Sequence, residues 1–155
     1  MGETRNVEGY KFAFKQRVRY QHVDVQGIVY HARYIDFLEG GRMEYFRNIG
    51  ITSKNMIEKG YDFVNVEIHC YYKKPAHLDE VILINTKLSW IRNSSFCFEY
   101  VLQEQESGNI LVTANSLHVM VDSHTYRARR IPDQYRELFR QFEGDTLTEY
   151  GLEAL

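Results

Sequence analysis

Residues 20–31, YQHVDVQGIVYH, hold the side chains whose types and spacing are best suited to chemistry. Asp24 is a lone carboxylate between two valines, and Gly27 follows it three residues later. A carboxylate in such a place can attack a carbonyl carbon or take a proton from water, and partial removal from water raises its basicity. Asp-x-x-Gly is also ordinary turn chemistry. Whether Asp24 only forms a turn or belongs to a reaction centre therefore depends on the elements that flank it.

This segment stands between a predicted strand and a predicted helix. In residues 12–20, mainly apolar side chains alternate with mainly basic ones with a period of two, which is typical of a half-buried strand. In residues 32–48 apolar side chains recur three and four residues apart, which indicates an amphipathic helix. The first turn of a helix leaves backbone N–H groups unpaired at the positive end of its dipole. Asp24 therefore precedes a site that can stabilise negative charge.

The predicted helix has two features that fix its surroundings. Gly40-Gly41 in its middle costs on the order of 1 kcal/mol per glycine relative to alanine. We therefore expect this part of the helix to approach a sheet closely. Opposite charges three residues apart, Arg33 with Asp36 and Glu39 with Arg42, predict salt-bridged positions on the exposed side.

The rest of the chain is mainly strand. Tight turns are predicted around residues 92–94 and 106–109, and Pro132 opens a last helix. The order favours an α+β fold in which one antiparallel sheet buries a face against one helix, so that some apolar surface is left for an oligomer. An acidic tail from Glu143 is expected to fray. The remaining predicted strands cover residues 62–72, 80–91, 96–102 and 110–121, and the remaining helices cover residues 53–59 and 133–142.

Composition limits the classes of function. A length of 155 residues predicts one domain over residues 1–155, and a formal charge of −2 gives no overall attraction to nucleic acid or to an anionic membrane. Cys70 and Cys97 show neither metal spacing nor a disulfide framework, which predicts reduced thiols in a cytoplasmic protein. No segment approaches the ~18 apolar residues of a membrane span, and the first residues lack the apolar core of a signal peptide. The six histidines lack the spacing of a metal site.

The pattern D-x-x-G-[IV]-V-Y-x-x-x-Y resembles the signature of hotdog-fold acyl-CoA thioesterases. The resemblance is to the 4-hydroxybenzoyl-CoA thioesterase family, especially its branch associated with the bacterial Tol–Pal system, and it covers residues 12–142. The residues that carry it are Asp24, Gly27, Ile28, Val29, Tyr30 and Tyr34.

This resemblance implies a hotdog fold, in which an antiparallel sheet of about five strands wraps around a long central helix. It implies homodimers or homotetramers with active sites at the dimer interface. The implied activity is hydrolysis of an acyl-coenzyme A thioester without a metal or a bound cofactor. By position, Asp24 matches the catalytic aspartate, and Tyr20 and His31 match two further active-site residues. The backbone N–H of His31 would point at the thioester carbonyl.

Thioester hydrolysis suits these residues because it passes through a tetrahedral oxyanion. The helix start supplies donors for that charge, and Asp24 would face them across the carbonyl. Gly27 lets the chain turn and lets ligand atoms approach the backbone. Tyr30 and Tyr34 are candidate walls of an acyl pocket. His31 could protonate the leaving thiolate or orient water, and Tyr20 could donate a hydrogen bond to Asp24 or to substrate.

Alternatives remain at the level of sequence. His22 and Val23 replace a carboxylate and a threonine that many relatives carry, which bears on substrate choice. The alternative functions are a thioesterase for acyl-carrier proteins and a non-catalytic acyl-CoA-binding module. A dehydratase of the same fold would need a His–Glu or His–Asp pairing that the sequence does not present.

Two further groups of residues have competing interpretations. Asp36 and Glu39 are rival catalytic carboxylates, because other hotdog thioesterases take theirs from the central helix. The basic clusters Lys73-Lys74 and residues 127–130 either hold the phosphates of coenzyme A or are merely solvated.

Overall fold

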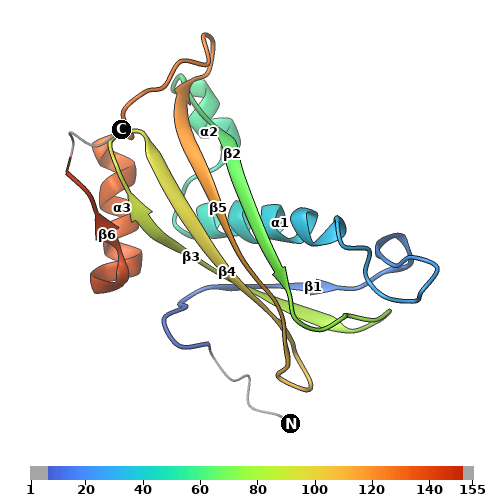
Figure 1. The fold of residues 1–155 in the computed structure, drawn as a ribbon. Coiled ribbons are helices and arrows are strands. Elements are labelled where there is room, and N and C mark those ends of the chain that lie inside the picture. Colours follow the sequence, from blue (N-terminus) through green and yellow to red (C-terminus); the bar gives the residue numbers. More distant parts are fainter. Residues whose placement is uncertain (1–6, 152–155) are drawn as a thin grey trace. The chain divides into compact units, whose positions relative to one another are not determined.

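The alternating segments of the sequence form one sheet in the computed structural model, which describes residues 7–151. Its strands follow the order β1-β3-β4-β5-β2, so the first two strands of the chain lie at opposite edges (Figure 1). The predicted antiparallel sheet of about five strands is confirmed, and a short sixth strand adds to β3 in parallel. The strands are β1 (Ala13–Arg17), β2 (Tyr61–Tyr72), β3 (Val81–Ile91), β4 (Ser95–Glu104), β5 (Ile110–Asp122) and β6 (Thr148–Glu149).

Three α-helices form close to the predicted positions. The long helix α1 begins one residue later than expected, and the hydroxyl of Thr52 caps α2 by accepting the N–H of Asn55 at 3.2 Å. None of the described helices is long and apolar enough to cross a membrane. The helices are α1 (Arg33–Asn48), α2 (Ser53–Glu58) and α3 (Asp133–Glu143), with 3₁₀ turns η1 (Tyr20–His22) and η2 (Gly144–Thr146).

The described residues pack as two compact units. The first comprises residues up to Tyr45 together with 70–86 and 100–114, and the second comprises residues 46–69, 87–99 and those from 115 onward. Both units take part of α1 and part of the sheet. The segment 20–31 lies entirely in the first unit.

In the first unit, Gly41 lets α1 lie directly on β3. A Cβ atom at Gly41 would stand 2.6 Å from Cγ2 of Ile84 and 2.8 Å from Oγ1 of Thr86, which are both fully buried. A Cβ atom at Gly40 would stand 3.4 Å from its nearest neighbour, a ring carbon of Phe14. The predicted close approach of helix and sheet is therefore confirmed, and Gly41 is the position that requires it.

Arg42 departs from the expectation of a salt-bridged surface position. Its side chain is buried, and its guanidinium donates to the hydroxyl of Tyr100 on β4 at 3.2 Å. The i,i+3 spacing to Glu39 was a poor guide because Arg42 stands one residue after Gly41, on the side of α1 that meets the sheet. By contrast, the Arg33–Asp36 pair is present at 3.2 Å with both side chains exposed.

The second unit has an aromatic core. The ring of Phe46, at the end of α1, contacts Phe63 on β2, Phe98 on β4 and Phe139 on α3. Arg136 of α3 is buried, and its guanidinium donates to the backbone oxygens of Ile131, Arg92 and Asn93 at 2.6–3.0 Å. This single side chain therefore joins α3 to the β3–β4 turn.

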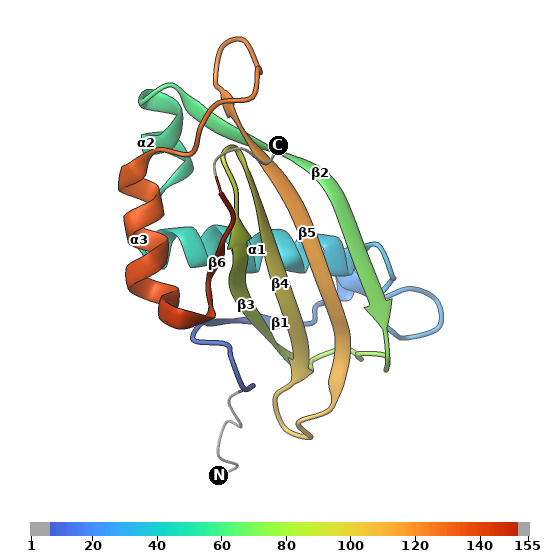
Figure 2. The same cartoon turned by 60° about the vertical axis from the view of Figure 1, so that its left-hand side comes forward.

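The end of α3 and the acidic segment that follows it make specific contacts. Glu143 is fully buried, and its carboxylate accepts the backbone N–H of Leu88 at 2.9 Å. Arg140 forms an ion pair with Glu149 at 2.8 Å, and β6 runs alongside α3 (Figure 2). Residues 152–155 lie outside the described part of the chain.

Candidate active site

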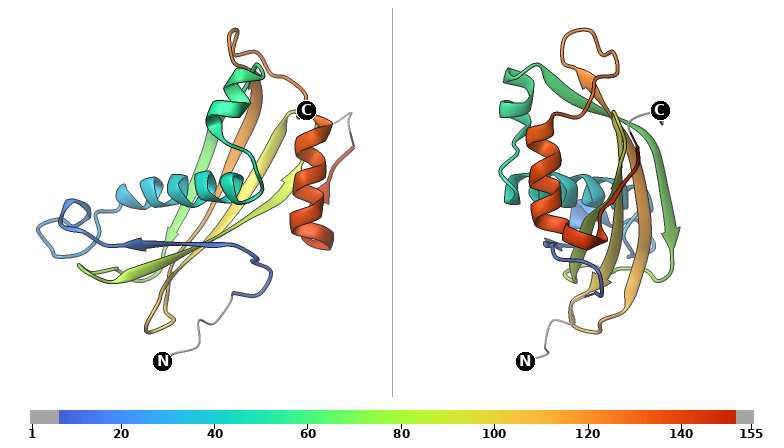
Figure 3. Two further views of the ribbon diagram at one scale, coloured as in Figure 1. Left: turned by 180° about the vertical axis from the view of Figure 1, so that it is seen from behind. Right: turned by 90° about the vertical axis from the view of Figure 1, so that its left-hand side faces the viewer.

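The loop that carries Asp24 is a tight turn closed by its own backbone. Val23 and Val29 form an antiparallel bridge. The N–H of Asp24 donates to the oxygen of Ile28, and the N–H of Gly27 donates to the oxygen of Asp24, both at 3.0 Å. Gly27 has a φ of 77°, a left-handed conformation that favours glycine. This loop precedes the N-terminal end of α1 (Figure 3).

The carboxylate of Asp24 takes part in the same turn. Its Oδ1 accepts the N–H of Gln26 at 2.8 Å, which is the hydrogen bond of an Asx turn. The side chain is partly exposed, and among residues 7–151 no hydrogen bond to its second oxygen is formed. The single chain thus gives Asp24 a turn role that uses one of its two carboxylate oxygens.

His22 is held inside the loop as a hydrogen-bond acceptor. The N–H of Arg19 donates to its Nδ1 at 2.9 Å, and its ring meets Phe37 of α1 edge-on at 4.9 Å. Burial, aided by the nearby charge of Arg33, lowers the pKa of His22 below its usual value. His22 is therefore a neutral structural group.

A groove of about 320 Å³ lies beside the start of α1. Its surface is mainly apolar, with one histidine and two lysines among the lining residues. These residues are Ile28, Val29, His31, Tyr34, Tyr72, Lys73, Lys74 and Pro75.

Residues 72–75 line one side of this groove, and residues 72–76 are hydrogen-bonded to the residues that line the other side. The hydroxyl of Tyr72 donates to the oxygen of His31 at 2.9 Å, and the N–H of Ala76 donates to the hydroxyl of Tyr34 at 3.3 Å. The N–H of Val29 donates to the oxygen of Ala76 at 2.9 Å. The sequence alone could not predict these contacts, because they join residues more than 40 positions apart.

The predicted site residues are only partly brought together. His31 and Tyr34 line the groove, whereas Asp24, Tyr20, Gly27 and Tyr30 are absent from its lining. Tyr20 is 83% exposed, and Tyr30 stacks obliquely on the ring of His31 at 4.4 Å. Sequence reasoning missed Tyr72 and Pro75. The signal for them was the run YYKKPA, in which the proline disfavours continuation as a central strand.

The start of α1 offers backbone donors. The N–H of Arg33 donates to the oxygen of Tyr30 at 2.9 Å. Among the described residues, neither the N–H of His31 nor that of Ala32 has a backbone acceptor. These two amides are therefore available to an oxygen atom of a ligand.

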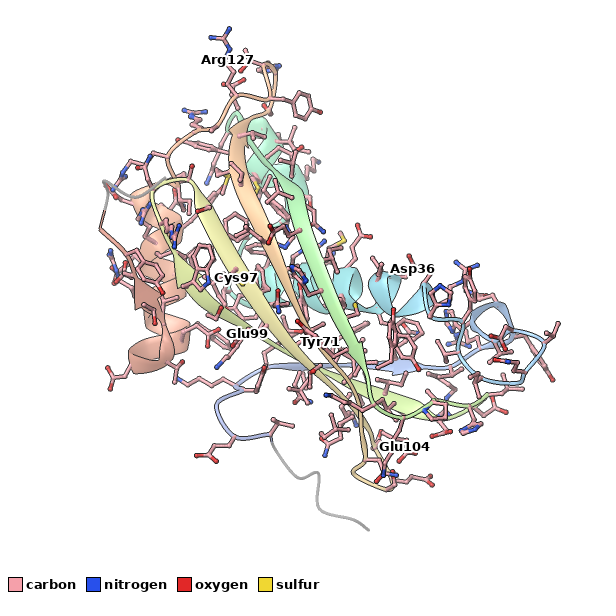
Figure 4. All side chains as sticks on the ribbon, viewed as in Figure 1. Asp36, Tyr71, Cys97, Glu99, Glu104 and Arg127 are labelled. Atoms are coloured by element: carbon pink, nitrogen blue, oxygen red, sulfur yellow. The ribbon has the colours of Figure 1, made fainter. Side chains whose placement is uncertain are left out.

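The rival carboxylates and the second basic cluster are engaged or exposed. Asp36, labelled on α1 in Figure 4, pairs with Arg33, and Glu39 is exposed. Arg129 donates to the oxygen of Gly60 at 2.9 Å and lies 3.7 Å from the centre of the Tyr61 ring. Within residues 7–151, no three His, Cys, Asp or Glu side chains are grouped so that they could hold a metal ion.

Three comparisons show what the chain is similar to. The acyl-CoA thioester hydrolase YbgC of Escherichia coli O6:H1 is 30% identical over 130 residues, which are 84% of this chain and 96% of that protein. A putative acyl-CoA thioesterase, YneP of Bacillus subtilis, is 31% identical over 122 residues, 79% of this chain and 85% of that protein. The crystal structure of a probable thioesterase from Bartonella henselae superposes with a TM-score of 0.72 at 30% identity, over 78% of this chain and 98% of that one.

These likenesses, together with the sheet order and the helix α1, confirm the predicted hotdog fold. Residues 18–139 match the family described as the thioesterase-like superfamily, a span that includes the Asp24 loop, the groove and most of α3. The chain therefore belongs to the thioesterase-like superfamily.

Proposed function

We propose that this protein is an acyl-CoA thioesterase that hydrolyses a small or medium acyl-coenzyme A to the free acid and coenzyme A. The observation that carries the proposal is the mainly apolar groove at the start of α1, lined by His31 and two lysines, in a chain of this superfamily. An apolar cleft with a few converging polar groups is the usual form of a small-molecule site.

The start of α1 is proposed as the oxyanion site. When water or a carboxylate adds to the thioester carbonyl, negative charge develops on its oxygen. The N–H groups of His31 and Ala32, at the positive end of the helix dipole, would donate to that oxygen. One such donor is worth roughly 3 kcal/mol of the activation barrier.

Asp24 is proposed to start the reaction. It either adds to the carbonyl carbon to form an anhydride that water then opens, or takes a proton from a water molecule that adds to the same carbon. In both routes the carbon–sulfur bond breaks and the thiolate leaves, to be protonated by His31. Tyr20 would hydrogen-bond Asp24 or the substrate. Water and side chains suffice for these steps, so we expect activity to survive EDTA treatment.

A second copy of the chain is proposed to complete the site. Around Asp24 the loop exposes large apolar side chains: Tyr20 is 83%, Val25 fully and Tyr30 44% exposed. Such a cluster marks a surface that a partner covers. In a homodimer or homotetramer, Asp24, Gly27 and Tyr30 would then lie at an interface instead of in bulk solvent. This arrangement accounts for the absence of Asp24 from the groove of the single chain.

Lys73 and Lys74 are proposed to contact the phosphates of coenzyme A. Both residues line the groove. Their backbone N–H groups donate to the oxygen of Leu111 at 2.8 and 3.2 Å, which anchors this part of the chain. The thiols of Cys70 and Cys97 are both free, which agrees with action in the reducing cytoplasm.

The test is free-thiol release from a panel of acyl-CoA and acyl-carrier-protein thioesters of increasing chain length, with aromatic acyl groups included. We expect Asp24→Asn to lower kcat by about 100-fold or more while the fold is retained. The exposed carboxylate Glu39 supplies the matched control, because Glu39→Gln should leave kcat near the wild-type value.

The outcomes separate the alternatives. Release from the carrier-protein thioesters only would identify the alternative thioesterase. Saturable acyl-CoA binding with no thiol release from any substrate would identify a binding module. Loss of turnover in Glu39→Gln with normal turnover in Asp24→Asn would reject the proposed site.

A further inference from the structure

Tyr72, the last residue of β2, contacts the backbone next to the proposed oxyanion site. Its hydroxyl donates to the oxygen of His31 at 2.9 Å. The ring meets the ring of His31 at 6.5 Å with an interplanar angle of 84°, and that of Tyr34 at 5.5 Å with an angle of 60°. The N–H of the following residue, Lys73, donates to the oxygen of Leu111 at 2.8 Å. The ring is half exposed, and these contacts place its hydroxyl beside the oxygen of His31.

The hydroxyl is suited to a permanent donor role. Burial raises the pKa of Tyr72 above its ordinary value, and the neighbouring Cys70 acts in the same direction. The group therefore keeps its proton at neutral pH. The hydroxyl of Tyr34 is placed elsewhere in the groove, where its oxygen accepts the N–H of Ala76.

The hydrogen bond from Tyr72 to the oxygen of His31 also affects the N–H of Ala32, which Tyr72 does not contact. The oxygen of His31 and the N–H of Ala32 belong to one peptide group, which is planar and holds the two in opposite directions. Fixing the oxygen therefore fixes the direction of the Ala32 N–H. A hydrogen bond to the oxygen also polarises the peptide group and strengthens its N–H as a donor, by about 10–30% in condensed-phase estimates.

We propose that Tyr72 is a positioning residue for hydrolysis, which aims the N–H of Ala32 at the oxyanion by holding the oxygen of His31. The inference rests on the proposed thioesterase function and assigns a role to a residue outside the family signature. Because the aimed N–H acts most strongly on the charged intermediate, its effect should appear in kcat and hardly in KM.

The experiment compares Tyr72→Phe with Tyr71→Phe. Each change removes one hydroxyl from a half-exposed ring, since Tyr71 is 54% and Tyr72 50% exposed. Tyr71, labelled on β2 in Figure 4, is absent from the groove lining. We expect Tyr72→Phe to lower kcat roughly five- to tenfold with KM within about twofold, in line with the loss of one hydrogen bond. Tyr71→Phe should match the wild type.

A second readout does not depend on turnover. In protein labelled with ¹⁵N-alanine, Tyr72→Phe should move or broaden the amide signal of Ala32 and leave that of Ala114, on β5, in place. Tyr71→Phe should change neither signal.

The two readouts distinguish failure of the positioning role from failure of the proposed function. An unchanged kcat, or a rise in KM alone, in Tyr72→Phe would overturn the positioning role. An unmoved Ala32 signal would also overturn it. If the wild type releases no thiol from any substrate while the Ala32 signal still moves, the proposed function fails and the structural link from Tyr72 to Ala32 stands.

Discussion

His22 and Asp24 stand two positions apart and have opposite surroundings. His22 is buried and accepts a backbone N–H through Nδ1, whereas Asp24 is partly exposed and bonds only within its turn in the described chain. Residue type alone does not predict this difference in exposure. Position on the turn decides: the side chain of His22 points toward Phe37 of α1, and that of Asp24 lies at the loop surface.

The lowered pKa of His22 makes stability depend on pH. Below its ordinary value of 6.5, an unfolded chain takes up a proton that the folded chain resists, because protonation of Nδ1 removes the acceptor for Arg19. Stability from this group is therefore full above pH 6.5 and is lost as the pH falls toward the lowered pKa. We expect the melting temperature to drop between pH 7.5 and 5.0.

The control for this prediction is His22→Asn, which offers an amide oxygen as acceptor but does not titrate. Its melting temperature should fall less over the same pH range, as measured by circular dichroism. An equal fall in both proteins would assign the pH dependence to other groups.

At the scale of elements, α1 illustrates what the sequence could predict. Its periodicity gave its limits to within one residue, and its paired glycines gave the close approach to the sheet. The burial of Arg42 and Glu143 was missed, because their partners, Tyr100 and Leu88, are 58 and 55 residues away. The contribution of Tyr72 and Pro75 to the groove was missed for the same reason. Local patterns report local structure, and both the buried charges and the site depend on distant contacts.

The two glycines of α1 should respond differently to alanine. In Gly41→Ala the new methyl group would overlap Ile84 and Thr86, which are buried and cannot move aside, so overpacking outweighs the better helix propensity. We expect a net loss of about 1–2 kcal/mol in the free energy of unfolding.

Gly40→Ala is the matched comparison. Its nearest neighbour, the half-buried ring of Phe14, stands 3.4 Å away and can shift. We expect a change between zero and a gain of about 1 kcal/mol. Urea denaturation of both variants provides the measurement, and equal stabilities would show that β3 yields to the added methyl group.

At the scale of the whole molecule, β2 is the feature that the single chain leaves open. It is a strand of 12 residues at the edge of the sheet, and residues 64–67 are exposed on both of its faces. A long exposed edge with apolar side chains invites another strand. We propose that β2 of a second copy pairs with this edge in the homodimer or homotetramer.

A charge on β2 should separate the copies. Val66 is 50% exposed, and Val66→Arg would place like charges close together in a symmetric pairing of two edges. We expect sedimentation to show a shift from dimer or tetramer to monomer, together with at least a roughly tenfold fall in kcat/KM. Ile57→Arg on α2, at 49% exposure, should change neither property. A monomeric wild type would contradict the proposed assembly.

The open edge of β2 also bears on how the protein behaves when it is scarce. If each reaction centre needs a neighbouring subunit, turnover per chain will decline on dilution once the subunits part, and will recover on concentration. The cell would then set the specific rate of thioester cleavage through the abundance of the protein as well as through the supply of substrate.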